Sequence, residues 1–388
     1  MSIEPTILTP GDTGHAGVWV YRYEAPQGPW RLSIATHAPP DSGKLSLGGF
    51  RIAPEERTSS PGFDSDREAI GLANGMEEKV YWSRLIGVGG PLARRDISRI
   101  VGGKCVMHPT PDARVGQPRD KALLDFAIAS FRDCESRAGI CITTGQDLGH
   151  GMLHDGSTGS LEYLNARFSG SVVADTSKPT GEGNFRLLVG MLRGAGIDVA
   201  RATVGLVGCG NIGMHLVERL RERGSTILAL ESRADRRAEL EAMGIRTWMP
   251  EQKDEFLSQP MDALCVNAAG NSLDAHALDV IARNKRLHVV CGSENLVMPD
   301  EQAGSESLRA AGKLYAPTEL GGMMGYLTAV EEYLAHAEGV PFDVHTLFDA
   351  AEKLDEAGDR GVDRVLERKG KVRFEDAIRE IYGRGGKA

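Results

Sequence analysis

A glycine-rich turn, GCGNIG at residues 208–213, constrains the fold of this chain more than any other feature. The apolar run ATVGLVG leads into the turn, and the amphipathic segment MHLVERLRERG follows it. Between a strand and a helix, the G-x-G-x-x-G spacing is typical of a dinucleotide-binding unit, because its glycines allow a tight turn, close approach of a pyrophosphate and close helix packing. Later strand-like runs, STILALE, DALCVNAAG and LHVVCGSEN, alternate with helical segments and predict a parallel α/β sheet.

This pattern predicts a Rossmann domain that binds NAD. Glu231 ends the STILALE strand, where an acidic side chain accepts hydrogen bonds from ribose hydroxyls and repels a 2′-phosphate. Arg233, Arg236 and Arg237 follow closely and keep NADP open as the alternative, because arginines can hold that phosphate. A glycine-rich turn that binds no nucleotide is the other interpretation. The candidate cofactor-binding residues of this region are Gly208, Gly210, Asn211, Ile212, Gly213, Glu231, Asn267 and Ala268.

Length and composition set the class of protein. A chain of 388 residues is longer than one core usually organises, which predicts two domains. The net charge of −9 argues against nucleic-acid and anionic-membrane partners and favours a small-molecule ligand. The six cysteines have neither CxxC nor metal-ligand spacing, and no run approaches the roughly 20 apolar residues of a membrane span. We therefore expect a cytoplasmic protein with reduced thiols and no metal.

The first part of the chain has a different pattern. VWVYRYEA and WRLSIATHA predict a hairpin turned by PQGP, and 64–79 and 120–134 have helical periodicity. The glycines before Lys104 are expected to let the backbone pass close to a ligand. From about Thr328 onward the chain is charged and predicted to be helical.

Seven short motifs occur in the order LGGFR, GMEEK, VGGK, TTGQDLG, PTGEGN, GLVGCGNIG and VVCGSEN. This ordered set resembles the glutamate/leucine/phenylalanine/valine dehydrogenase family over about residues 45–330. The resemblance implies a substrate-binding and oligomerisation domain at 1–170, a Rossmann domain at 171–335, and C-terminal helices at 336–388 that pack across the junction. Catalysis is then expected in the cleft between the domains, in a homo-oligomer.

The resemblance also assigns the chemistry. Lys79 matches the lysine that holds the substrate α-carboxylate, and Lys104 matches the general base that activates water. Asp147 matches the aspartate that exchanges a proton with the substrate nitrogen. The alternatives are a solvated lysine at position 79 and an ordinary turn aspartate at position 147.

Further positions match the substrate pocket and the nicotinamide side. Gly48 and Gly49 resemble the paired glycines of the pocket, and Leu47 stands where glutamate-specific members have a lysine. This implies an apolar or aromatic substrate, closer to the leucine/phenylalanine type. The remaining matches, on the nicotinamide side, are Thr180, Asn184 and Asn295, the last of which could also be a turn residue.

Some features depart from the family. RLIGVGGPLARRDISRI, residues 84–100, is an insert between Lys79 and Lys104, and we expect its arginines to be solvated. Glu294 replaces a small residue, and the APTELGGMMGY loop is shorter than its counterpart. The expected reaction is oxidative deamination of an amino acid to a 2-oxo acid and ammonia, and its reverse. The alternatives are reduction of an unusual imine on the same fold and NAD sensing without turnover.

Overall fold

The computed structural model describes residues 3–26, 28–145 and 147–383, and the chain divides into two compact units. Unit 1 is formed by Met1–Tyr81, Pro91–Thr176 and Tyr326–Asp343. Unit 2 is formed by Trp82–Gly90, Ser177–Gly325 and Val344–Ala388. Among the described residues, none of the helices combines the length and apolar character that a bilayer span requires.

Unit 1 is built on a mixed sheet with the order β1-β2-β3-β6-β4-β7, and β5 pairs with β6 beside this path. The pairs β1/β2, β2/β3 and β3/β6 are antiparallel, whereas β4 and β5 run parallel to their neighbours. The strands are β1 (Thr6–Leu8), β2 (Trp19–Glu24), β3 (Arg31–Thr36), β4 (Leu45–Leu47), β5 (Phe50–Ile52), β6 (Ile100–His108) and β7 (Cys141–Thr143).

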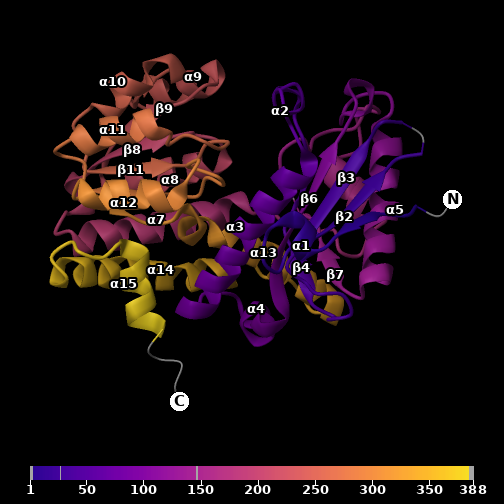
Figure 1. Ribbon diagram of the computed structural model, residues 1–388. Coiled ribbons are helices and arrows are strands. Elements are labelled where there is room, and N and C mark those ends of the chain that lie inside the picture. Colours follow the sequence, from indigo (N-terminus) through magenta and orange to yellow (C-terminus); the bar gives the residue numbers. More distant parts are fainter. Residues whose placement is uncertain (1–2, 27, 146, 384–388) are drawn as a thin grey trace. The chain divides into compact units, whose positions relative to one another are not determined.

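The predicted hairpin is confirmed as β2 and β3, in which Tyr21 faces Ile34 across the antiparallel pair. The PQGP segment between them includes residue 27, which lies outside the described residues. Both strands are largely buried, as expected for runs rich in β-branched and aromatic residues. Aromatic side chains join this sheet to α5, with Phe50 and Phe131 packed edge to face at 5.3 Å between ring centroids. Figure 1 shows α5 lying along the strands of unit 1.

The helices that begin in unit 1 include the predicted ones, with different ends. The segment expected to be helical over 64–79 continues to residue 86, because no glycine or proline follows Lys79 before Gly87. The helices are α1 (Pro10–Thr13), α2 (Glu55–Thr58), α3 (Ser65–Ile86), α4 (Pro91–Asp96), α5 (Asp120–Ala138) and α6 (Ser160–Asn165), with 3₁₀ turns at Ile97–Arg99 and Pro111–Ala113.

The insert after α3 is anchored rather than loose. It forms the last three residues of α3, a glycine-rich bend and α4. The carboxylate of Glu331, on helix α13 (Thr318–Glu338), accepts hydrogen bonds from the backbone N–H groups of Leu92 and Ala93 at 2.9 and 2.8 Å. The neighbouring Glu332 does the same for Val173 and Ala174, at 3.0 and 2.9 Å. As expected, the insert's arginines are exposed; they are Arg84, Arg94, Arg95 and Arg99.

Unit 2 contains the predicted parallel sheet, with the order β10-β9-β8-β11-β12-β13. In order of appearance this is 3-2-1-4-5-6, the doubly wound arrangement of dinucleotide-binding domains. All pairings are parallel. The strands are β8 (Thr203–Val207), β9 (Thr226–Leu230), β10 (Arg246–Trp248), β11 (Ala263–Val266), β12 (Val289–Gly292) and β13 (Leu314–Tyr315).

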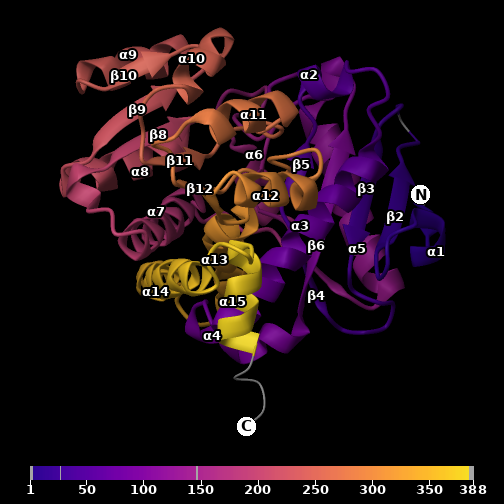
Figure 2. The same ribbon diagram turned by 60° about the vertical axis from the view of Figure 1, so that its left-hand side comes forward.

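Helices flank this sheet, and the C-terminal segment is helical as predicted, but its first helix, α13, begins at Thr318 and not near Thr328, so the APTELGGMMGY segment expected to be a loop is largely helical. Figure 2 shows the long helices α7 and α14 lying side by side, where Gly190 and Gly358 let the two backbones approach. The helices are α7 (Ser177–Gly194), α8 (Asn211–Arg223), α9 (Ala234–Ala242), α10 (Lys253–Leu257), α11 (Ala275–Arg283), α12 (Glu301–Ala310), α14 (His345–Glu367) and α15 (Phe374–Tyr382), with 3₁₀ turns at Val199–Arg201 and Pro250–Gln252.

Candidate functional site

In unit 1 the structure brings Lys104 and Asp147 into direct contact. Lys104 lies in the middle of β6, and Asp147 follows β7 on the loop that leads to Gly149. The Lys104 ammonium forms an ion pair with Asp147 Oδ2, and the two side chains are only 7% and 12% exposed. A buried ion pair of this kind argues against the alternative that Asp147 is a simple turn residue.

Arg51 completes this cluster. Its guanidinium donates to Asp147 Oδ1 at 3.3 Å and to Glu68 Oε1 at 2.6 Å, and its side chain is 4% exposed. Burial alone would raise the pKa of Asp147, but Lys104 and Arg51 outweigh burial and hold it well below its usual value. Asp147 is therefore an ionised carboxylate between two cations.

His150 is three residues after Asp147 in the chain. Its Nε2 is 2.7 Å from the carbonyl oxygen of Phe50, and its Nδ1 is 3.0 Å from Ser160 Oγ. Burial lowers the pKa of His150, so the ring is neutral at physiological pH. Its contacts with Phe50 and Ser160 hold the loop that carries Asp147 in place.

Lys79 is presented by α3 and is 5% exposed. The same helix supplies Glu68 to the cluster, and Glu77 accepts a hydrogen bond from the N–H of Gly102 at 2.6 Å. The Glu68 contact attaches α3 to β5, and the Glu77 contact attaches it to β6, the strand that carries Lys104. Both candidate lysines of unit 1 are thus held on regular elements that pack together.

The glycines of unit 1 make close packing possible. A Cβ on Gly48 would lie 1.5 Å from the carbonyl oxygen of Gly103, so no larger residue fits there. A Cβ on Gly102 would lie 2.2 Å from the nitrogen of Glu77, and one on Gly103 would lie 2.2 Å from Ser46 Oγ. At Gly102 and Gly103 the space of a side chain is occupied by α3 and β4, so packing alone accounts for these two glycines.

Leu47 ends β4 next to the paired glycines. It is 1% exposed and lies opposite Gly102 on one neighbouring strand and Thr143 on the other. Gly49 contributes its carbonyl oxygen to the N–H of Cys105 at 3.3 Å, which keeps this corner in register with β6.

In unit 2 the glycine turn has the geometry that the motif predicts. Gly208 has a φ of 81°, a left-handed conformation that glycine adopts without strain, and a Cβ there would meet Asn267 and Ala268 at 2.9 Å. Gly213 packs against the carbonyl of Gly208. Gly210 precedes α8, and a Cβ built on it would have no atom within 4 Å.

The open space over Gly210 fits a pyrophosphate. The first turn of α8, which contains Asn211 and Ile212, directs backbone N–H groups toward that space. The packed first and third glycines and the open second one are what a dinucleotide requires of this motif. These residues therefore fit the cofactor on steric grounds.

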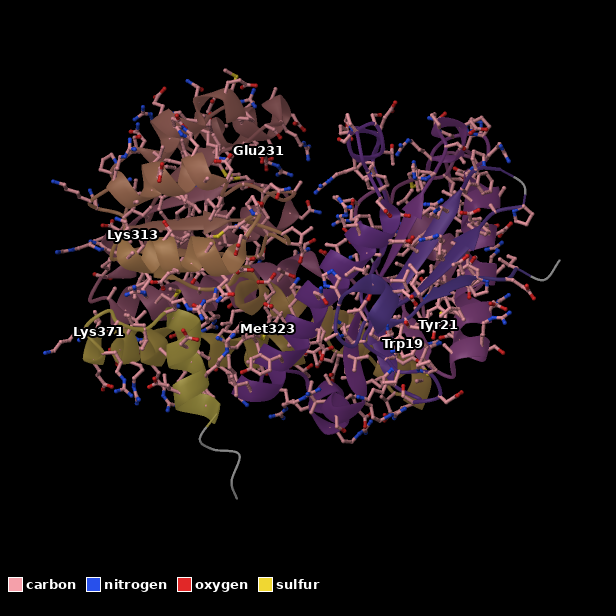
Figure 3. All side chains as sticks on the ribbon, viewed as in Figure 1. Trp19, Tyr21, Glu231, Lys313, Met323 and Lys371 are labelled. Atoms are coloured by element: carbon pink, nitrogen blue, oxygen red, sulfur yellow. The ribbon has the colours of Figure 1, made fainter. Side chains whose placement is uncertain are left out.

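Glu231 follows β9 and is 6% exposed (Figure 3). Its Oε2 accepts from the N–H of Cys209 at 2.6 Å, and its Oε1 accepts from the N–H of Arg233 at 2.9 Å. Arg237 donates to the carbonyl oxygen of Glu231 at 2.8 Å, whereas the Arg233 side chain is 58% exposed and pairs with Asp235. Through its hydrogen bond to Cys209, Glu231 also stabilises the glycine turn, a structural role that the sequence did not indicate.

A buried amide network lies beside the carboxyl ends of β11 and β12. Asn184 Nδ2 donates to Asn267 Oδ1 at 2.6 Å, and Ser293 Oγ donates to the same oxygen at 2.7 Å. Asn184 is fully buried on α7, and Thr180, one turn earlier, is 5% exposed.

Glu294 reshapes the loop after β11. Its carboxylate accepts from the N–H groups of Ala268 at 3.0 Å and Ser272 at 2.8 Å, and from the Ser272 hydroxyl at 2.7 Å. Burial raises the pKa of Glu294. Asn295, the next residue, is half-buried in unit 2 with the other cofactor candidates.

The structure thus separates the candidates into two sets. The unit 1 set contains Leu47, Gly48, Gly49, Lys79, Lys104 and Asp147, and the unit 2 set contains the residues of 180–295. Sequence reasoning missed Arg51, Glu68 and Ser293 as members of the polar networks. Only Arg51 had a signal, its place just after the paired glycines.

Comparisons with known proteins agree with this architecture. No protein-family model matches the chain, and no curated protein sequence matches it. Among solved structures, L-tryptophan dehydrogenase from Nostoc punctiforme is similar with a TM-score of 0.63 and 18% identity, over 93% of this chain and 93% of that one. The hetero-hexameric glutamate dehydrogenase from Thermus thermophilus is similar with a TM-score of 0.65 and 16% identity, over 96% of this chain and 86% of that one. A glutamate dehydrogenase from Plasmodium falciparum is similar with a TM-score of 0.63 and 13% identity, over 94% of this chain and 80% of that one. The chain therefore has the two-domain, Rossmann-containing fold of the amino acid dehydrogenases.

Proposed function

We propose that this protein is an NAD(P)-dependent amino acid dehydrogenase of the glutamate/leucine/phenylalanine/valine type. The observation that carries the proposal is the buried Lys104–Asp147 pair, because taking charges out of water is costly and ionisable groups in such surroundings cluster at functional sites. In this proposal unit 1 binds the amino acid and unit 2 binds the dinucleotide.

The proposed reaction converts an L-amino acid, water and NAD⁺ into a 2-oxo acid, ammonium, NADH and a proton. The glycine turn at Gly208–Gly213 would hold the dinucleotide, which would supply the acceptor for the hydride of the substrate Cα. Lys79 holds the α-carboxylate, and Lys104, once deprotonated, takes the proton of the water that adds to the imine carbon. Asp147 accepts hydrogen bonds from the substrate nitrogen.

The geometry refines the role of Asp147. A carboxylate whose pKa is held so low is a poor proton acceptor. Proton exchange with the substrate nitrogen therefore requires Lys104 to lose its charge or move away first. In this proposal the two residues act in sequence: the Lys104 ammonium loses its charge or moves away before Asp147 takes a proton.

Substrate and cofactor preferences follow from two side chains. Leu47 offers an apolar contact and no cation for a distal carboxylate, which favours apolar or aromatic amino acids over glutamate. Glu231 favours NAD over NADP by charge repulsion with a 2′-phosphate. We further propose that the protein works as a homo-oligomer.

The test is a coupled set of absorbance assays of NADH and NADPH with ammonium and a panel of aliphatic, aromatic and acidic 2-oxo acids. We expect ammonium-dependent oxidation of NADH with apolar oxo acids. Faster turnover with 2-oxoglutarate would contradict the role of Leu47. Reduction of a preformed imine without ammonium would favour the imine-reductase alternative. Cofactor binding without turnover on any substrate would favour a sensor.

A further inference from the structure

A separate cavity of about 240 Å³ lies within unit 2. It is found at the end of the sheet where β12 and β13 begin, which in a parallel sheet is opposite to the end that carries the glycine turn. The end of α7, helix α12, strand β13 and the α14–α15 segment surround it. Its apolar wall consists of Ala195, Ile197, Leu314, Val365, Leu366, Val372 and Phe374.

One buried cation lines this cavity. Lys313 is 8% exposed, and its ammonium donates to the carbonyl oxygens of Asn284 and Leu287, the latter at 2.8 Å. Within the described part of the chain these carbonyls are its hydrogen-bond acceptors, and none of its partners is a carboxylate. The ammonium has three N–H groups, so one is left to donate to a ligand, and among the described residues no carboxylate forms an ion pair with this buried charge.

The other charges near the cavity are already matched. Arg309 pairs with Glu306 at 2.6 Å, and Arg373 pairs with Glu375 and Asp376 at 3.2 and 2.9 Å. These three carboxylates are not part of the lining. The lining's titratable side chains are Arg309, Lys313, Tyr315, Arg373 and His288.

We propose that the cavity binds a small monocarboxylic acid with a branched or aromatic apolar body. The carboxylate pairs with Lys313, and the body packs against Leu314, Val365 and Phe374. An amino acid is disfavoured, because no lining residue is a carboxylate that could take its ammonium group. The volume lies below the range of about 300–1,000 Å³ typical of pockets for drug-sized ligands, so a short chain or a single ring fits. This inference does not depend on the proposed dehydrogenase activity.

Isothermal titration calorimetry of the full chain tests the proposal with 4-methylpentanoate and 3-phenylpropanoate as probes. 4-Methylpentan-1-amine serves as the charge-reversed probe. Ala195→Leu fills the cavity, and Lys313→Met keeps the side-chain length but removes the charge. Lys371→Met is the matched control, because Lys371 is exposed on the neighbouring loop and extends away from the ribbon in Figure 3.

We expect the wild type and Lys371→Met to bind the acids alike, and Lys313→Met to bind at least about tenfold more weakly. Ala195→Leu should no longer bind an acid molecule in the cavity. The amine should not bind in the cavity of any of the proteins. Equal affinity of all four proteins for the acid would show that the acid binds outside the cavity. Equal affinity for the acid and the amine would show that the Lys313 charge does not select the ligand. Either result, or no binding to the wild type, overturns the inference.

Two controls separate this result from other failures. The unfolding temperature and NADH binding of each variant show that unit 2 is folded. Ammonium-dependent turnover, measured on the same proteins, reports on the proposed function alone. Acid binding without turnover would leave the cavity inference standing while the dehydrogenase proposal fails, and turnover without acid binding would do the reverse.

Discussion

Replacing Arg51 with methionine tests the buried cluster of unit 1 directly. Arg51, Lys104, Glu68 and Asp147 carry two positive and two negative charges, so their sum is zero. Arg51→Met leaves one surplus negative charge among side chains that are at most 12% exposed. Removing one partner of a buried pair typically costs about 3–5 kcal/mol, since the remaining charge has lost its compensation.

The assay is denaturant unfolding near neutral pH, with Glu68→Gln and the double variant Arg51→Met/Glu68→Gln included. The double variant restores neutrality, so it should lose less stability than the sum of the single variants, with a coupling of about 1–3 kcal/mol. The matched control is Arg31→Met. Arg31 pairs with Glu24 at 3.1 Å with both side chains exposed, so its loss should cost only about 0–1 kcal/mol.

The effect has a defined pH dependence. The pKa of Asp147 is lowered in the folded protein, so its contribution to stability is present above the ordinary value of 3.8 and is lost as pH falls through the folded value. The difference between Arg51→Met and the wild type should therefore be full at neutral pH and shrink in acid. A cost below about 1 kcal/mol, or one equal to that of Arg31→Met, would refute the argument that the cluster is an electrostatic unit.

Other predictions concern the glycines and the candidate catalytic and cofactor residues. Gly48→Ala should destabilise the protein by at least about 1–3 kcal/mol in denaturant unfolding, because the new Cβ would overlap the Gly103 carbonyl. Gly210→Ala should leave stability within about 1 kcal/mol but weaken NADH binding in a fluorescence titration, and unchanged binding would place the pyrophosphate elsewhere. Glu231→Gln should reduce the preference for NADH over NADPH, measured as the ratio of kcat/KM values, and an increased preference would contradict the charge argument. Lys104→Ala should lower kcat by at least about 100-fold while the melting temperature stays measurable, and retained turnover would exclude Lys104 as the base.

The parts of the fold that depend on local pattern could be predicted from the sequence. The strand, turn and helix around Gly208 were predicted correctly, because a buried strand and an amphipathic helix each have their own periodicity and the glycines mark the junction between them. The β2/β3 hairpin was correct for the same reason. The predicted end of α3 was wrong, since no glycine or proline interrupts the helical pattern between Lys79 and Gly87.

The polar networks could not be predicted in the same way. Arg51 and Glu68 are 17 positions apart, and Arg51 and Asp147 are 96 apart, so their meeting depends on how α3, β5 and the loop after β7 pack. The amides of Asn184 and Asn267 are 83 positions apart and meet only because α7 crosses the end of β11. Charge and polarity are visible in the sequence, but the partners are chosen by tertiary structure.

The two adjacent glutamates of α13 limit how this chain can be shortened or recombined. Glu331 is 3% exposed, and the backbone of α4 satisfies its carboxylate. If residues 84–100 were replaced by a shorter connection, that carboxylate would be stranded without donors, and the deletion would be tolerated only together with a change such as Glu331→Leu. Glu332 would be unaffected, because it serves a different loop. The insert and one side chain more than 200 positions later therefore have to be changed together.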